Sequence, residues 1–153
     1  MTTQTLSRMA DLTRDAVTYQ ETRDAAEMIH QMSFGDNFYS FPQTVKAWLT
    51  NRYVFTSDPG EMLIHPLKQL ADIQARGVVY GDCDDVAMLA ASLLASMGYQ
   101  VRFKAIILAP DGSFRHVFTE WNAGGEGSAA VWMAVDPMAS GEPQYREYIV
   151  KEI

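Results

Sequence analysis

The sequence predicts an α+β fold in which helices pack on one antiparallel sheet. Two patterns indicate this fold class. Through the first two thirds of the chain, apolar residues recur at spacings of three and four, the period of an amphipathic helix. From Val101 onwards they alternate with polar residues, the period of a half-buried strand. With 153 residues, 48% of them hydrophobic and 20% charged, the chain is expected to form one folded domain around one core.

Two helices are predicted between Leu6 and about Met32, with a joint near Thr18. Methionine fills irregular gaps in protein cores, so the Met-rich stripe of this region indicates packing and not a cofactor site. His30 falls in the last predicted turn, where a helix C-terminus favours a positive charge, and complementing the helix dipole is its plainest role. The residues expected to face the core are Met9, Leu12, Ala16, Ala25, Met28, Ile29 and Met32.

A loop that packs through aromatic side chains is predicted from Phe34 to Phe41. Ser40 and Pro42 then offer a cap and an early helical proline to a short helix, because neither needs a helical hydrogen bond at that position. This helix is expected to end near Asn51.

A short extended piece, a turn and another helix follow. Tyr53–Phe55 is expected to be extended, and Asp58–Gly60 contains the Asp-Pro-Gly sequence of a turn. Pro66 can open the next helix, and Gly77 can close it in the left-handed conformation. His65 lies just before the proline, which favours an extended conformation, and we expect it to be a surface or packing residue.

The stretch from Gly81 to Gly98 predicts a buried helix near the middle of the chain. Gly98 stands where a left-handed C-terminal cap belongs. Cys83, the only cysteine, lies in the first turn, where unpaired N–H groups and the positive end of the helix dipole stabilise a thiolate. A lone cysteine is more often core filling, so this position fits either role. The apolar residues with helical spacing are Val86, Leu89, Ala90, Leu93, Leu94 and Met97.

Three strands and an edge strand are predicted after this helix. Segments 101–107 and 114–121 should form an antiparallel hairpin through the turn at 110–113. Residues 122–128 link them to a third strand from Ala129 to Val135, and residues 145–153 supply the edge strand. The 122–128 connection is rich in glycine, but no Gly-Lys-Ser/Thr sequence follows it, which favours a hairpin connection over a phosphate-binding loop.

Three residues in chain order fit the requirements of thiol acyl transfer. This chemistry needs a nucleophile, a base within hydrogen-bond reach and a group that orients the base. Cys83 opens the central helix, His116 lies in the predicted hairpin and Asp136 ends the third strand. Adjacent antiparallel strands can bring the histidine and the aspartate together, and the sheet can carry both to the helix N-terminus. Taken singly, His116 and Asp136 also fit a core histidine and a turn residue.

These residues resemble the transglutaminase-like superfamily, which has a papain-like fold. The resemblance covers about residues 53–137, with further similarity at Tyr53, Asp58-Pro59, Glu61 and Pro66 to small bacterial and phage-encoded members. It implies that Cys83 is the nucleophile, His116 the base and Asp136 the orienting acid of a thioester mechanism. Family members include proteases, amidases, peptide cross-linkers and peptide:N-glycanases. The blocks that carry the resemblance are Gly81–Asp85 with the helix to Gly98, His116–Glu120, and Trp132 four residues before Asp136-Pro137.

The resemblance divides one domain, residues 1–153, into a helical lead-in (1–52), a catalytic-type core (53–137) and a C-terminal edge segment (138–153). A peptide or amide is the implied substrate, with no cofactor and no metal. A net charge of −7 opposes binding to nucleic acid or to an anionic membrane. A single cysteine, no signal segment and no long apolar run predict a cytoplasmic protein, or one packed into a virion if it is phage-encoded.

Two alternative functions and two open points accompany this hypothesis. The chain could be a catalytically silent structural or assembly protein of a phage particle, or Asp82, Asp84 and Asp85 could bind a hard cation. The same aspartates are expected to raise the thiol pKa, so activation would need a Cys83–His116 ion pair. The second oxyanion donor is open between three polar residues: Tyr80, Gln69 and Asn51.

Overall fold

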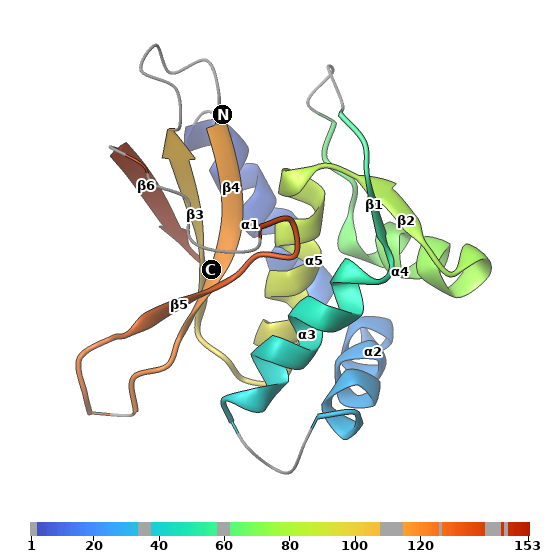
Figure 1. The fold of residues 1–153 in the computed structure, drawn as a ribbon, viewed down its shortest axis with the longest axis horizontal. Helices are drawn as coiled ribbons and strands as arrows, with labels where there is room; N and C mark the ends of the chain where they lie inside the picture. The colour runs from blue at the N-terminus through green and yellow to red at the C-terminus, as the bar shows by residue number, and fades with distance from the viewer. Residues whose placement is uncertain are drawn as a thin grey trace.

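In the computed structural model, which describes residues 3–33, 38–57, 62–107, 115–125, 127–139, 145 and 147–153, one buried helix separates two sheets. Figure 1 shows the helix α5 in the middle, a four-stranded antiparallel sheet on one side and a two-stranded parallel sheet on the other. The remaining helices surround α5, so the predicted arrangement of helices on an antiparallel sheet is confirmed. No helix of the described residues is long and apolar enough to cross a membrane.

The first two helices are α1 (Thr3–Val17) and α2 (Gln20–Gln31), separated at the joint predicted near Thr18. Part of the predicted inward face is wrong, because Met28 and Met32 are exposed. α2 turns a narrower and smaller face to the core, through Thr22, Ala26 and Ile29. Met32 lies at the C-cap, after the last helical residue, and Met28 lies outside the buried face.

The next elements are α3 (Ser40–Thr50), β1 (Tyr53–Phe55) and α4 (Pro66–Arg76). Gly77 caps α4 at a φ of 81°, a left-handed conformation that glycine adopts without a steric penalty. His65 is the N-cap of α4: its Nδ1 accepts a hydrogen bond from the Leu67 N–H at 3.1 Å, and its Nε2 lies 2.8 Å from Asp15 Oδ2. It is therefore a structural residue. The predicted loop at 34–37 and turn at 58–60 lie outside the described residues.

A short strand that the sequence did not predict, β2 (Val79–Gly81), leads directly into α5. It pairs in parallel with β1, with Tyr53 opposite Val79 and Phe55 opposite Gly81. This pairing fixes the backbone immediately before Cys83.

The central helix α5 (Cys83–Ser96) is buried around its whole circumference, with every residue from Asp84 to Leu94 buried. One side packs on the sheet, where the Thr119 hydroxyl donates to the Ala87 carbonyl at 2.7 Å, and helices α1 to α4 cover the rest. Gly98 follows the helix at a φ of 85°. The predicted buried helix with a glycine cap is therefore present.

The large sheet has the strand order β5-β4-β3-β6. The hairpin of β3 (Val101–Ile107) and β4 (Arg115–Asn122) pairs as predicted, whereas the turn at 110–113 lies outside the described residues. β5 (Trp132–Val135) begins later than predicted, because Asn122 Oδ1 accepts hydrogen bonds from the Gly124 and Val131 N–H groups and holds the connection as a loop. β6 (Glu147–Glu152) is the edge strand beside β3.

Candidate active site

Cys83 is the first residue of α5, and the side chains of two neighbouring aspartates hydrogen-bond to the backbone around it. The Asp82 carboxylate accepts hydrogen bonds from the Asp84 and Asp85 N–H groups at 3.0 and 3.2 Å. The Asp85 carboxylate accepts one from the Asp82 N–H at 3.1 Å. This reciprocal capping box satisfies backbone N–H groups that have no partner within the helix. The Gly-Asp-Cys-Asp-Asp sequence therefore fixes where α5 starts and places the sulfur at its N-terminus.

Of the three aspartates expected to raise the pKa of the Cys83 thiol, Asp84 and Asp82 do so, whereas Asp85 does not contribute. Asp82 and Asp85 point at backbone N–H groups, and Asp84 lies beside the thiol, with the Cys83 Sγ 3.6 Å from its Oδ1. The three carboxylates do not converge as a cation site would require. Among the described residues there is no group of three or more His, Cys, Asp or Glu side chains that could hold a metal ion.

Gln69 of α4 ties the helix start to its surroundings. It is fully buried, and its amide nitrogen donates to the Ile64 and Asp85 carbonyls, both at 2.9 Å. Its oxygen accepts from the Tyr53 hydroxyl at 3.0 Å. Both amide hydrogens are occupied, so Gln69 is not a free oxyanion donor. Of the other two candidates, Tyr80 and Asn51 are exposed, and neither has a contact with Cys83 among those recorded for the described residues.

Gly81 lies where a side chain has no room. A Cβ at this position would overlap the Tyr53 hydroxyl and lie 3.0 Å from Asp85 Oδ2. Gly81→Ala is therefore expected to destabilise the fold by about 1–3 kcal/mol, because Tyr53 or the capping box must move. Urea unfolding measures the change. Gly125→Ala is the matched control, since a Cβ there meets nothing within 4 Å, and an equal loss in both variants would contradict this account.

The buried carboxyl of Asp85 makes stability depend on pH. Burial raises its pKa to about 7, against the opposing effect of the Ile64 and Asp82 N–H groups. An unfolded chain loses this proton near pH 4, so the folded state binds more protons between these values and stability falls as pH rises through that window. Asp85→Asn should remove this slope. Urea unfolding of both proteins from pH 4 to 8 tests it, and parallel curves would contradict it.

His116 of β4 and Asp136 lie side by side on the sheet. The His116 Nε2 is 2.6 Å from the Asp136 Oδ2, and both side chains are largely buried. The pairing of Thr119 with Val135 brings the end of β5 next to this part of β4. The other oxygen of Asp136 accepts from the Met138 N–H at 3.0 Å, which fixes the carboxylate orientation.

The Cys83 sulfur also contacts β4, one residue after His116, where the Val117 N–H donates a hydrogen bond to it. Ala123, the residue after β4, donates its N–H to the Val131 carbonyl at 2.7 Å, so the odd-numbered residues of β4 direct their N–H groups towards β5. Val117 belongs to this set but lies beyond the end of β5. The structure thus places the sulfur beside the backbone that carries His116. The sequence contains no signal for this backbone donor.

Cys83 is half-buried, and its surroundings favour the protonated thiol. Burial, followed by the charge of Asp84, raises the pKa of Cys83 to about 12, and the Val117 N–H opposes this shift. Burial is therefore a larger cause than the aspartates on which the sequence-based expectation relied. A resting thiolate–imidazolium ion pair is not what this environment favours.

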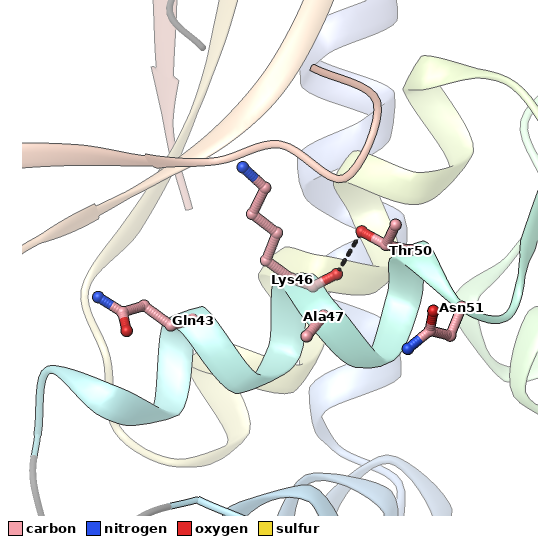
Figure 2. Close-up of a pocket in the computed structure, with 5 residues that line it drawn as sticks. All are labelled: Gln43, Lys46, Ala47, Thr50 and Asn51. Carbon is pink, nitrogen blue, oxygen red and sulfur yellow. Dashed lines mark hydrogen bonds between the residues drawn. The ribbon is translucent and has the colours of Figure 1, made fainter. Parts of the chain in front are cut away.

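A hollow of about 290 Å³ lies along α3, which packs beside β5, the strand that precedes Asp136. Figure 2 shows its lining residues on successive turns of the helix, with the Thr50 hydroxyl hydrogen-bonded to the Lys46 carbonyl at 2.7 Å. Neither Cys83 nor His116 lines it. Its lining residues are Gln43, Lys46, Ala47, Thr50 and Asn51.

No protein-family profile and no curated protein matches the sequence. Two solved proteins are similar in structure. Over 76% of this chain, a candidate cysteine protease from Cytophaga hutchinsonii matches with a TM-score of 0.53 and 19% identity. Over 87%, LapG from Legionella pneumophila matches with a TM-score of 0.56 and 17% identity, both with and without EGTA treatment.

The chain has the papain-like fold. The fold inferred from the three sequence blocks is therefore confirmed. This papain-like chain spans 37% of the Cytophaga hutchinsonii protein and 72–74% of LapG. At these identities the likeness concerns the fold, and the chemistry must be argued from the residues.

Proposed function

We propose that this papain-like chain is a thiol-dependent amide hydrolase or acyltransferase that acts through Cys83, His116 and Asp136. The observation that supports this most strongly is the 2.6 Å contact between His116 and Asp136 on a strand whose next N–H group, from Val117, binds the Cys83 sulfur. The proposed base and its orienting acid are thus in contact, and the sulfur of the proposed nucleophile lies beside the next residue of the same strand, which supports the proposal.

The His116–Asp136 contact assigns the roles of the two ring nitrogens. Because a carboxylate accepts hydrogen bonds, Nε2 carries the ring hydrogen and donates a hydrogen bond to Asp136. Nδ1 then keeps a lone pair and is the nitrogen that can remove the thiol proton. The carboxylate also stabilises the imidazolium that forms when the proton arrives.

The reaction divides into two acyl transfers. As the Cys83 sulfur attacks the substrate carbonyl carbon, its proton moves to His116 Nδ1 and the carbonyl oxygen becomes an oxyanion. Collapse of this intermediate breaks the carbon–nitrogen bond, and the leaving amine takes the proton back. Water or another amine then attacks the thioester, loses its proton to His116 and releases Cys83 as a thiol.

The start of α5 supplies one oxyanion donor. The capping box uses the N–H groups of Asp84 and Asp85, whereas no recorded hydrogen bond of the described residues uses that of Cys83. This N–H lies at the positive end of the helix dipole, where a developing negative charge is stabilised.

After burial, the charge of Asp84 is the next largest cause of the raised Cys83 pKa, so its removal should increase thiol reactivity. In Asp84→Asn the pKa of Cys83 should fall, because its carboxylate is the nearest negative charge. The alkylation rate by iodoacetamide at pH 7 should then rise roughly threefold for each unit by which the pKa falls, because the thiolate fraction rises tenfold while each thiolate becomes less nucleophilic. Asp11→Asn, on the surface of α1, is the control. Unchanged alkylation in Asp84→Asn would contradict the assigned cause.

A second candidate function is that of a structural or assembly protein with the same fold and no turnover. The pKa of about 12 for Cys83 favours it, because a protonated thiol is a weak nucleophile without its base. Under this hypothesis Cys83→Ala would leave biological function intact, whereas mutations in the core would destroy it.

The test of the proposed function uses p-nitrophenyl acetate, an activated acyl donor that needs no specific binding pocket. The wild type should release p-nitrophenolate in a burst and carry one acetyl group on Cys83 by peptide mass spectrometry, and Cys83→Ala should show neither. Adding a primary amine separates the two outcomes, since an acyltransferase will form the amide and a hydrolase will release acetate. An equal burst in Cys83→Ala would overturn the proposal. The similar structure from Cytophaga hutchinsonii is named as a candidate cysteine protease, which supports peptide amides as the next substrates to test.

A further inference from the structure

The strand β6 forms an edge of the large sheet and exposes apolar residues. It pairs with β3 on one side, and no described strand pairs with its other side. Tyr148, Ile149 and Val150 are 54%, 42% and 40% exposed. Unpaired apolar edges invite another strand, and proteins normally protect them with charges or cover them.

The hydrogen bonds show which residues of β6 are available for further pairing. The Ile153 N–H donates to the Val101 carbonyl at 3.3 Å, so odd-numbered residues of β6 turn their backbone groups to β3. Even-numbered residues turn theirs outward. The Glu152 carbonyl agrees with this, since it accepts from Arg14 Nη2 of α1 at 3.4 Å. The backbone groups of Tyr148 and Val150 therefore face away from the sheet.

We propose that a second copy of this chain pairs with β6 in antiparallel orientation, with the two-fold axis at Ile149. Residues whose backbone groups face outward must lie opposite one another in the two strands. The register can therefore change only in steps of two residues, and each such step moves the two-fold axis by one residue. With the axis at Ile149, Tyr148 of each copy faces Val150 of the other, and their outward N–H and C=O groups form two mutually bonded pairs.

Charge selects this register over its neighbours. It sets Glu147 opposite Lys151 twice, once on each side of the axis, in pairs where side chains approach closely. Moving the axis by one residue along β6, to Tyr148 or Val150, sets Ile149 opposite Glu147 or Lys151 instead. Charges on an edge usually prevent pairing, but here the two signs are complementary under two-fold symmetry.

The dimer would join two four-stranded sheets into one and bury the apolar centre of β6. It leaves the candidate active site free, because β5 and Asp136 lie at the opposite edge of the sheet. The proposal is thus independent of the proposed function.

Sedimentation equilibrium of charge-reversed variants tests both the dimer and its register. The wild type should dimerise with increasing concentration, whereas Glu147→Lys and Lys151→Glu should each remain monomeric because like charges then face each other. An equimolar mixture of the two variants should form a heterodimer, since each Lys again faces a Glu, and the double variant should recover the homodimer. Heterodimer formation also shows that both variants are folded. Lys68→Glu, on the exposed face of α4, is the control and should dimerise.

A wild type that stays monomeric at all concentrations, or single variants that fail to associate when mixed, would overturn the proposal. Disulfide trapping in the Cys83→Ala background is a second readout. Ile149→Cys should cross-link to its symmetry mate under mild oxidation, because the two residues face each other at the axis. Tyr148→Cys should not, because it faces Val150. Equal cross-linking of both would contradict the register.

Discussion

Replacing His116 with alanine is expected to slow acetylation of Cys83 by p-nitrophenyl acetate by roughly 10²–10⁴-fold, the range typical of a lost general base. The effect should be large because the thiol, with a pKa raised to about 12, has almost no thiolate at neutral pH. The Val117 N–H remains in His116→Ala, but it only partly offsets burial and cannot accept the thiol proton.

The p-nitrophenolate burst in a stopped-flow instrument gives the acylation rate. His30→Ala is the control, since His30 packs against Phe41 at a ring distance of 5.5 Å and has no part in the proposed chemistry. Raising the pH should restore part of the rate of His116→Ala as thiolate forms without a base. If His116→Ala acylates as fast as His30→Ala, the imidazole is not the base.

Replacing Asp136 with asparagine is expected to lower the acylation rate by a similar factor, roughly 10²–10⁴-fold, through the wrong tautomer. Asparagine can keep the hydrogen bond from the Met138 N–H through its oxygen. The amide NH₂ that it then presents to His116 donates a hydrogen bond, so the proton is driven to Nδ1. The lone pair at Nδ1 that should receive the thiol proton is thereby lost.

Nitrogen NMR of His116 is the readout that a merely structural role of Asp136 would leave unchanged. The wild type should show a protonated Nε2 and an unprotonated Nδ1, and Asp136→Asn should reverse or mix the two. Because both residues act as one unit, the double variant of His116→Ala and Asp136→Asn should be no slower than His116→Ala alone. Additive losses, or an unchanged tautomer, would show that Asp136 does not act through His116.

The elements that the sequence predicted well are those with local signals. The ends of α4 follow from Pro66 and Gly77, and those of α5 from its acidic start and Gly98. β2 was missed because three residues are too few to show the alternation of apolar and polar residues that indicates a strand. Its partner β1 is also distant in the sequence. The late start of β5 depends on the side chain of Asn122, whose oxygen bonds two backbone groups that a pattern of apolar residues does not show.

The residue types of the candidate site and their order could be predicted from the sequence, but the hydrogen bonds made by its aspartates could not. Asp82 and Asp85 have the spacing of a capping box, but the structure is needed to show which N–H groups their carboxylates meet. One of those belongs to Ile64, at 2.8 Å from Asp85, in the connector before α4. The leading effect of burial on the Cys83 pKa likewise depends on the packing of the whole helix start, which no local spacing encodes.

The most direct test of the proposed triad is the distance between the Cys83 sulfur and His116 Nδ1 in a crystal structure of the wild type. We expect a separation within about 4 Å, with the imidazole still hydrogen-bonded to Asp136 through Nε2. A sulfur that packs into the core with His116 turned away from it would contradict the account, and the fold would then serve a purpose other than thiol catalysis.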